Sequence, residues 1–325
     1  MGGDVVGIDD VSVERLLLGL LGDSVVVRSA AELAGGHYNT TIGVVLADGV
    51  RLILRAAPPE SSQFRSESRL MRNELAAAPT IRSLAAIPDT LVSDFSHRLI
   101  DRDVLLQSWL PGVPAVDALT AGGEPAALAI WRQIGEILAR FHQRAGTSYG
   151  RFSGPRTDSW SDQLAIVFDN LGRDFEVAAL DPTPIRDCLK TVAWGRELLD
   201  DVEPRLLHGD LGPGNVLVCS PTDPTITGLI DCDRSWWGDP AADWTFYLVN
   251  RRRPAQQQAF WSGYRMSASP ADHEPGDFRS LLYLARSEAD ASLELHRLGE
   301  AVKLKASQQS LAEIAMRLTA TNPNG

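Results

Sequence analysis

Short apolar runs separated by turn residues fill the first third of the chain. They lie at Val25–Arg28, Thr41–Leu46, Arg51–Leu54, Leu91–Phe95, His97–Ile100 and Val104–Gln107. Asp48-Gly49, between two of these runs, is a strong hairpin signal because this pair readily adopts the positive φ angles of a tight turn. The pattern predicts a mostly antiparallel sheet over about the first 108 residues.

One helix is expected within this sheet. Residues 64–77 contain no Gly or Pro and are rich in helix formers, and Pro79 is expected to end the helix.

The pattern changes after residue 108. Helical stretches are expected at Ala126–Gln143, 161–171, 184–200 and Phe278–Leu318, with a β-like stretch at Leu206–Asp233 between them. The sequence therefore predicts an α+β chain, with a small β-rich lobe at 1–108 and a larger, mainly helical lobe at 109–325.

Composition narrows the class of protein. The 325 residues are 44% hydrophobic and 22% charged, which suits a folded chain of two lobes and excludes a disordered one. A net charge of −11 argues against nucleic acid as the main partner. Only three of the 31 basic residues are lysines.

Three features suggest the compartment. Cys188, Cys219 and Cys232 show no CxxC spacing, which disfavours disulfides and a zinc site and fits a reducing compartment. The chain start lacks a basic segment followed by an apolar run, and no apolar stretch is long enough to cross a bilayer. We expect a cytoplasmic protein without a membrane partner.

The candidate chemistry lies in two loops that follow apolar runs. The first carries His208, Asp210 and Asn215, and the second carries Asp231 and Asp233. Carboxylate and amide oxygens suit Mg²⁺, and Asp210 is placed to accept a proton from a hydroxyl. A catalytic aspartate with a metal-binding asparagine and aspartate is the arrangement of kinase-type phosphoryl transfer. His208 alone fits a loop brace better than a catalyst.

These segments resemble a known family. His208-Gly-Asp-Leu-Gly-Pro-Gly-Asn215, and Ile230-Asp-Cys-Asp followed by Gly238-Asp-Pro and Asp243, are similar to the aminoglycoside phosphotransferase and choline kinase-like family. The resemblance covers residues 28–250 and implies the two-lobed protein kinase-like fold. It implies that Asp210 is the catalytic base, that Asn215 and Asp231 hold Mg²⁺, and that Asp239 and Asp243 brace the catalytic loop.

The segment Gly35-Gly-His-Tyr-Asn-Thr-Thr41 lies between two predicted strands. Taken by itself it could be a plain β-turn. It resembles the family's GGxxN form of the glycine-rich loop. The resemblance implies a nucleotide site for ATP or GTP built from Gly35, Gly36, Tyr38, Asn39 and Thr40.

Arg55 occupies the position of the kinase lysine that holds nucleotide phosphates, although it could also be a surface arginine at a strand end. Its carboxylate partner is Glu67 or Glu74, which are seven residues apart and would share a helix face. We favour Glu74 for its spacing to the next strand and expect Glu67 to be solvated. Ser108 and Leu110 lie in a segment that resembles the family's linker and would offer backbone groups to the base.

The acceptor side is less defined. Asp158–Asp187 carries a net charge of −5 and would attract a cationic compound, unless it is simply a solvated helix face. Arg251-Arg-Arg253 and Arg265 point to an anionic group or to solvent. For Trp236, Trp237 and Trp244, packing beneath the loop is favoured over stacking on a substrate ring.

The leading hypothesis is an ATP- or GTP-dependent, Mg²⁺-requiring O-phosphotransferase. Its acceptor would be a small-molecule hydroxyl, above all that of an antibiotic in resistance or self-protection. The alternative acceptor is a primary metabolite such as an amino alcohol or sugar. A noncatalytic nucleotide-binding module is disfavoured because Asp210, Asn215 and Asp231 are all present, and a metallohydrolase because no HExxH motif occurs.

Overall fold

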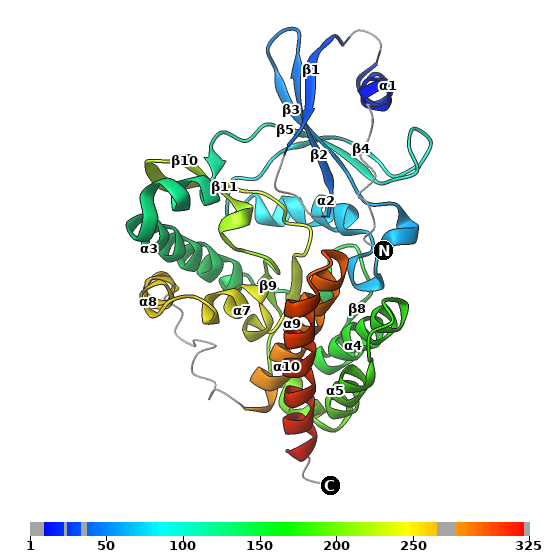
Figure 1. The fold of residues 1–325 in the computed structure, drawn as a ribbon, viewed down its shortest axis with the longest axis vertical. Helices are drawn as coiled ribbons and strands as arrows, with labels where there is room; N and C mark the ends of the chain where they lie inside the picture. Colours follow the sequence, from blue (N-terminus) through cyan, green and yellow to red (C-terminus); the bar gives the residue numbers. More distant parts are fainter. Residues whose placement is uncertain (1–9, 23–24, 34–37, 265–276, 322–325) are drawn as a thin grey trace.

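A five-stranded antiparallel sheet forms the upper lobe of the computed structural model (Figure 1), which describes residues 10–22, 25–33, 38–264 and 277–321. The strand order is β1-β2-β3-β5-β4. The strands are β1 (Val27–Glu32), β2 (Thr40–Leu46), β3 (Arg51–Ala56), β4 (Thr90–Asp94) and β5 (Val104–Ser108). The predicted hairpin at Asp48-Gly49 is confirmed: β2 pairs with β3, and Gly49 has a φ of +91°.

Helices cover both faces of this sheet. Helix α1 (Asp10–Leu21), which the sequence analysis did not predict, buries Leu16 and Leu17 against one face, and Leu106 of β5 belongs to the same cluster. Helix α2 (Leu70–Ile81) covers the other face, where Met71 packs with Leu105. The alternation of Leu105 and Leu106 is the two-residue period of a strand buried on both sides.

The predicted helix at 64–77 is wrong at both ends. Residues 60–67 form two short 3₁₀ turns, η1 (Glu60–Ser62) and η2 (Arg65–Glu67), and α2 then continues two residues beyond Pro79. The Asp174 carboxylate, from the lower lobe, accepts the backbone N–H groups of Arg65 and Ser66 at 2.7 and 2.9 Å. Asp174, which is 109 residues from Arg65 in sequence, therefore binds backbone N–H groups that would otherwise donate within a helix.

The predicted strand at His97–Ile100 is also wrong. His97 has a φ of +58°, and its ring lies 3.0 Å from the Asp103 carboxylate. This side-chain contact favours a bend, which brings the chain back into β5.

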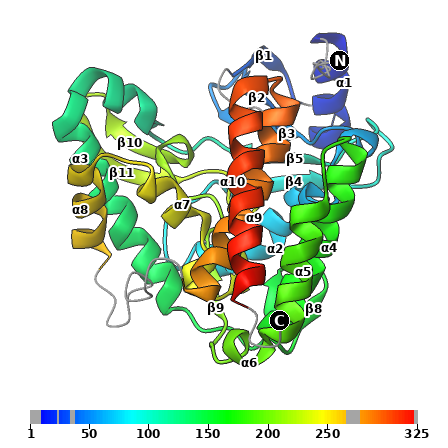
Figure 2. The ribbon, with the colours of Figure 1, turned by 60° about the horizontal axis from the view of Figure 1, so that its bottom comes forward.

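The lower lobe is mainly helical. Its helices are α3 (Ala115–Gln143), α4 (Trp160–Val177), α5 (Thr183–Trp194), α6 (Arg196–Leu199), α7 (Trp244–Asn250), α8 (Pro254–Gly263), α9 (Phe278–Arg297) and α10 (Ala301–Ala320). Figure 2 shows α9 and α10 beside α4 and α5.

Two small sheets complete the lower lobe. The first has the order β11 (Asp223–Leu229), β10 (Val216–Ser220), β6 (Val113–Pro114). The second has the order β8 (Arg156–Thr157), β7 (Tyr149–Arg151), β12 (Trp236–Gly238), β9 (Arg205–Leu207). Short 3₁₀ turns occur at η3 (Pro213–Asn215) and η4 (Pro240–Ala242).

Two predicted helices are each two helices in the structure. The stretch 184–200 breaks at Gly195, where an added Cβ would lie 2.3 Å from the Phe278 ring. The stretch Phe278–Leu318 breaks at Gly299, which has a φ of +70°. Helix α3 begins earlier than expected and has a non-helical residue at Gly123.

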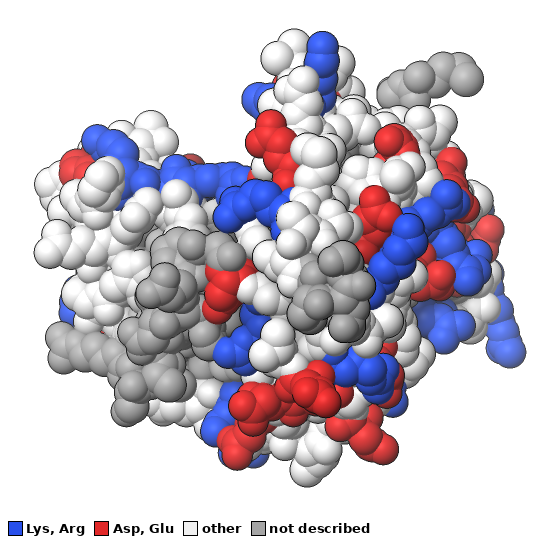
Figure 3. All heavy atoms as spheres, turned by 90° about the horizontal axis from the view of Figure 1, so that it is seen from below, with Lys and Arg blue, Asp and Glu red and all other residues white. Residues whose placement is uncertain are grey.

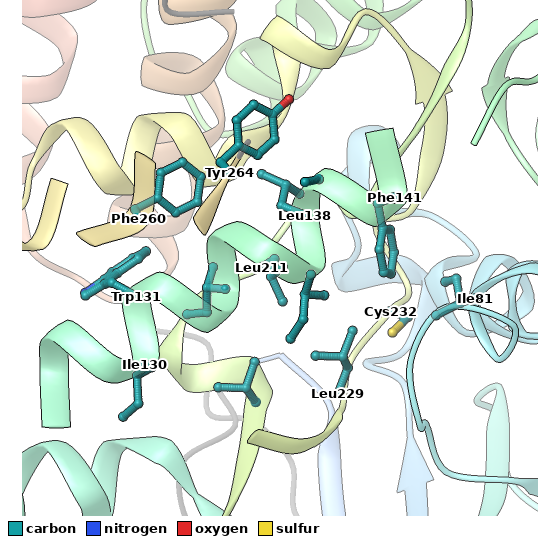
Figure 4. Close-up of a cluster of buried hydrophobic side chains, with 14 of the residues drawn as sticks. Ile81, Ile130, Trp131, Leu138, Phe141, Leu211, Leu229, Cys232, Phe260 and Tyr264 are labelled. Carbon is teal, nitrogen blue, oxygen red and sulfur yellow. The ribbon is translucent and has the colours of Figure 1, made fainter. Parts of the chain in front are cut away.

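The main core lies directly beneath the polar loops. Figure 4 shows Leu138 and Phe141 of α3 with Leu211, Leu229 and Cys232, which flank the candidate residues in sequence. All five are at most 2% exposed. Burial of one such side chain is worth about 1.5–3 kcal/mol, so the core fixes both loops from below. The expected α+β architecture of a β-rich and a helical lobe is confirmed.

Candidate active site

His208 holds the loop that carries Asp210. It is fully buried, and its Nδ1 accepts the backbone N–H of Asp210 at 3.3 Å, while its Nε2 lies 3.7 Å from Cys232 Sγ. An accepting Nδ1 places the proton on Nε2 of a neutral ring. Burial lowers the pKa of His208 to about 4, against the opposing charge of Asp243. His208 therefore acts as a neutral brace within the loop.

Asp243 supports the same loop from below. Its Oδ2 accepts the backbone N–H of His208 at 2.9 Å and lies 3.3 Å from His142 Nε2. Burial would raise the pKa of Asp243, but His142 and the hydrogen bond from the Thr245 N–H together outweigh it and lower the pKa to about 2. Asp239, the other expected brace, instead accepts the Tyr283 hydroxyl at 2.7 Å and ties η4 to α9.

Any residue other than glycine at position 209 would be strained and would collide with a neighbour. The φ of Gly209 is +80°, and an added Cβ would lie 2.3 Å from the carbonyl oxygen of Arg234. The missing side chain lets the backbone of Arg234 pack against the loop beside Asp210.

The structure brings Asp210, Asn215 and Asp231 together. Asn215 Nδ2 donates to the Asp210 Oδ2 at 3.1 Å and to the Asp210 carbonyl at 2.8 Å. The Ile230 N–H donates to the Asn215 carbonyl at 3.0 Å, which places Asp231 next to Asn215. Burial and the charge of Asp231 raise the pKa of Asp210 to about 7, although Arg234 opposes the shift. A carboxylate with this pKa is suited to accept a proton near neutral pH.

Arg55 connects the lobes, and its carboxylate partner is Glu74. Its guanidinium lies 2.5 Å from the Glu74 carboxylate and 2.5 Å from that of Asp231. Gln107 Nε2 also donates to Glu74, at 2.8 Å. The Arg55 side chain is only 8% exposed, which excludes the alternative of a surface arginine.

The candidate metal ligands include Asp233, to which the sequence analysis assigned no role. Oxygens of Glu74, Asp231 and Asp233 lie within 4.8 Å of one another. Glu74 is occupied by Arg55 and Gln107, whereas the Asp231 side chain is 37% exposed. Burial would raise the pKa of Asp231, but the charges of Arg55 and Arg234 lower it, so this carboxylate is ionised. Oxygen donors from Asp231 and Asn215 fit Mg²⁺, with Asp233 buried behind them.

The nucleotide residues are described in part. Gly35 and Gly36 lie outside the described residues, whereas Tyr38, Asn39 and Thr40 lead into β2. Asn39 and Thr40 are buried. The N–H of Ser108 donates to the Asp89 carbonyl at 2.8 Å, so it is already engaged. Leu110 packs on Gly228, where a Cβ would lie 2.3 Å from Leu110 Cδ2.

Asp210 lies in the wall of a cavity of about 780 Å³ between the lobes. Its charged residues are balanced, five of each sign: Glu60, Glu67, Asp210, Asp290 and Glu294 against Arg65, Arg69, Arg151, Arg234 and Arg286. Trp236 and Trp244 also line it, whereas Trp237 packs on Gly146.

The expected acidic rim does not form. None of the seven acids in 158–187 lines the cavity, where this stretch contributes Gln163, Ile166, Val167 and Asn170. Asp174 binds backbone N–H groups, and four others pair with arginine or lysine. Figure 3 shows acidic and basic side chains next to one another at several places on the face seen from below.

The expected anion patch does not form either. Arg251 pairs with Glu288 at 2.6 Å, Arg253 pairs with Glu124, and Arg252 lies over the Trp131 ring. Arg265 lies outside the described residues. These contacts connect the segment between α7 and α8 to α3 and α9.

The model of the phosphotransferase enzyme family matches residues 29–281. A curated relative, the probable ketoamine kinase of Synechocystis sp., is 30% identical over 167 residues. That match covers 47% of this chain and 52% of the relative, so it spans about half of that protein.

Solved structures share the fold at low identity. Aminoglycoside phosphotransferase APH(4)-Ia is 19% identical with a TM-score of 0.66, covering 95% of this chain and 99% of that one. A thermostable mutant of that enzyme, in a ternary complex with AMP-PNP and hygromycin B, is 20% identical with a TM-score of 0.63, covering 94% and 98%. The GDP complex of wild-type aminoglycoside 2′-phosphotransferase-IIIa is 15% identical with a TM-score of 0.59, covering 95% and 99%.

These neighbours confirm the expected fold, and the family match covers both lobes, including Arg55, Asp210, Asn215 and Asp231. The chain belongs to the phosphotransferase enzyme family.

Proposed function

We propose that the protein transfers the terminal phosphoryl group of ATP or GTP to a hydroxyl of a small molecule, with Mg²⁺ as cofactor. The observation that carries this proposal is the position of Asp210. It lies in the wall of a 780 Å³ cavity and is hydrogen-bonded to Asn215, next to the Arg55–Asp231 ion pair. A base next to metal-binding oxygens and a cation is the arrangement that phosphoryl transfer uses.

Each residue then has a defined task. Asp210 accepts the proton of the acceptor hydroxyl. The hydroxyl oxygen then forms the new bond to phosphorus, and the nucleoside diphosphate leaves. Asn215 and Asp231 would hold Mg²⁺, which neutralises phosphate charge when bound. Arg55, held by Glu74, would bind phosphate oxygens alongside Gly35, Gly36, Tyr38, Asn39 and Thr40. His208 keeps the Asp210 loop in place.

The linker between the lobes would bind the base. Because the Ser108 N–H already donates to Asp89, we assign the donor to the Leu110 N–H and the acceptor to the Ser108 carbonyl. We place the reaction in the cytoplasm, which fits the free thiols of Cys188, Cys219 and Cys232.

Two classes of acceptor follow, and the cavity favours one. A hydroxylated antibiotic, in resistance or self-protection, is supported by the aminoglycoside phosphotransferases that share the fold. A polycationic antibiotic would be expected to select an acidic cavity, whereas this one is lined by five basic and five acidic residues. The balanced charge favours a primary metabolite that is neutral or zwitterionic, such as a sugar or an amino-sugar conjugate. The ketoamine kinase relative supports this second class.

The test is incubation of the protein with Mg-ATP or Mg-GTP and a matched panel of aminoglycosides, other hydroxylated antibiotics, amino alcohols, sugars and sugar–amine conjugates. Mass spectrometry would detect the gain of one phosphate. We expect products from the neutral and zwitterionic acceptors. Products from polycationic antibiotics alone would reverse the preference, and no product from any acceptor would contradict the proposed reaction.

A further inference from the structure

Glu67, which the sequence analysis expected to be solvated, is buried in the wall of the cavity. It is 6% exposed, and its carboxylate binds two arginines from distant parts of the chain. Arg297, the last residue of α9, donates to Oε2. Arg234 Nη2 lies 3.6 Å from Oε1.

The two arginines lead to different parts of the cleft. Arg234 packs its backbone on Gly209, beside Asp210, and its charge opposes the rise in the Asp210 pKa. Arg297 lies over the ring of Tyr38, with 5.1 Å between its guanidinium carbon and the ring centroid. The Tyr38 hydroxyl in turn donates to the Glu67 carbonyl at 3.0 Å.

The Glu67 carboxylate is not needed to anchor the η2 turn, because other side chains already do so. Asp174 already accepts the N–H groups of Arg65 and Ser66, and Arg151 donates to the carbonyls of Ser66 and Ser68. Burying a further charge is costly unless it is paired. The Glu67 side chain is paired on both oxygens, and each pair reaches a different element.

We propose that Glu67 is a positioning residue that couples the nucleotide loop to the acceptor cleft. It holds Arg297 beside Tyr38 and Arg234 beside Asp210, so nucleotide binding at the loop orders the C-terminal end of α9 and the catalytic loop. The coupling rests on the proposed nucleotide-binding function. Arg297 lies beyond residues 29–281, which the family model matches, so this coupling joins a matched segment to an unmatched one.

The experiment is hydrogen–deuterium exchange of the full chain with and without Mg–AMP-PNP. In the wild type, the nucleotide should slow exchange at residues 38–42 and also, by about fivefold or more, at residues 293–298. In Glu67→Gln the slowing at 38–42 should remain and that at 293–298 should disappear. Arg297→Met tests the same link if Glu67→Gln does not fold.

The matched control is Asp162→Asn. Asp162 lies on α4, and its exposed carboxylate pairs with Arg196 of α6 at 2.8 Å. This variant should keep both protected segments. Equal protection of 293–298 in Glu67→Gln, or protection confined to 38–42 in the wild type, would overturn the coupling. Absence of protection at both segments in the wild type would overturn nucleotide binding, and the coupling with it.

Discussion

Arg55 is the residue in which this chain departs most clearly from the kinase pattern. One planar guanidinium contacts both Glu74 and Asp231 at 2.5 Å. A lysine ammonium is a single point of charge on a flexible stem and cannot reproduce this forked geometry. This forked contact fits the proposed role of Arg55 in place of the usual lysine.

Arg55→Lys should fold and should weaken binding of Mg–AMP-PNP by about tenfold, which corresponds to about 1.4 kcal/mol. Isothermal titration calorimetry measures the affinity. Arg28→Lys, an exposed change in β1, is the control and should leave it unchanged. Equal affinity of Arg55→Lys and the wild type would show that Arg55 does not hold the nucleotide.

His208 should make the fold sensitive to acid. Its pKa falls from 6.5 to about 4 on folding, so protonation favours the unfolded chain. Above pH 6.5 the ring is neutral in both states and His208 does not lower the free energy of unfolding. As the pH falls from 6.5 toward 4, the free energy of unfolding falls by about 3 kcal/mol relative to a chain with a residue that does not titrate.

This loss is measured as the difference in unfolding free energy between the wild type and His208→Gln across about pH 4–7. The difference is needed because Asp210 shifts in the opposite sense: its raised pKa favours the folded chain as pH falls. We expect the wild type to lose its advantage over His208→Gln on acidification. A difference that does not vary with pH would mean that His208 is not a buried neutral ring.

Asp210, Asn215 and Asp231 could be predicted because they lie in two loops joined by a short β-hairpin and are therefore close in sequence. Asp210, Asn215 and Asp231 indeed lie together. Glu67 could not be assigned, because Arg297, its partner, lies 230 residues away. Buried pairs of this kind depend on how helices pack and have no local sequence signal.

At the level of elements, strands were predicted well where a turn signal limited them, as at Asp48-Gly49. Helix ends failed where tertiary contacts compete with local preference. The Asp174 carboxylate binds backbone groups within the helix predicted at 64–77, and the helix predicted at 184–200 breaks at Gly195, against which the Phe278 ring packs. Helix α1 was missed although Leu16 and Leu17 carry its buried face.

The loop between β9 and η3 gives an element-scale prediction. Gly209→Ala places a Cβ 2.3 Å from the Arg234 carbonyl at a φ of +80°. It should destabilise the fold by about 3 kcal/mol or more and lower kcat, because Arg234 and Asp210 must move apart.

Gly49→Ala is the comparison that separates backbone strain at a positive φ from collision of the new Cβ with a neighbour. Gly49 has a similar φ of +91° but no atom within 4 Å of an added Cβ, so only backbone strain of about 1 kcal/mol is expected. Thermal unfolding and kcat of both variants provide the comparison. Equal effects of the two substitutions would show that contact with Arg234 is unimportant.

At the scale of the whole molecule, net charge is a poor guide to the charge of the cavity. The acidic stretch at 158–187 would attract a cation, yet six of its seven acids pair with nearby basic groups or accept backbone N–H groups. The cavity draws its charged side chains from residues 60–69, β7, the loops that carry Asp210 and Arg234, and α9, and the two signs are equal in number. Among the described residues no helix is long and apolar enough to cross a membrane.

The central claim is that Asp210 activates an acceptor hydroxyl for phosphoryl transfer. The most direct test is the rate of phosphate-ester formation by the wild type and by Asp210→Asn, with Mg-ATP and the best acceptor from the panel. Removing a positioned general base should lower kcat by about 10²–10⁴-fold while the affinity for Mg–AMP-PNP changes little. Ester formation by Asp210→Asn at the wild-type rate would contradict this account.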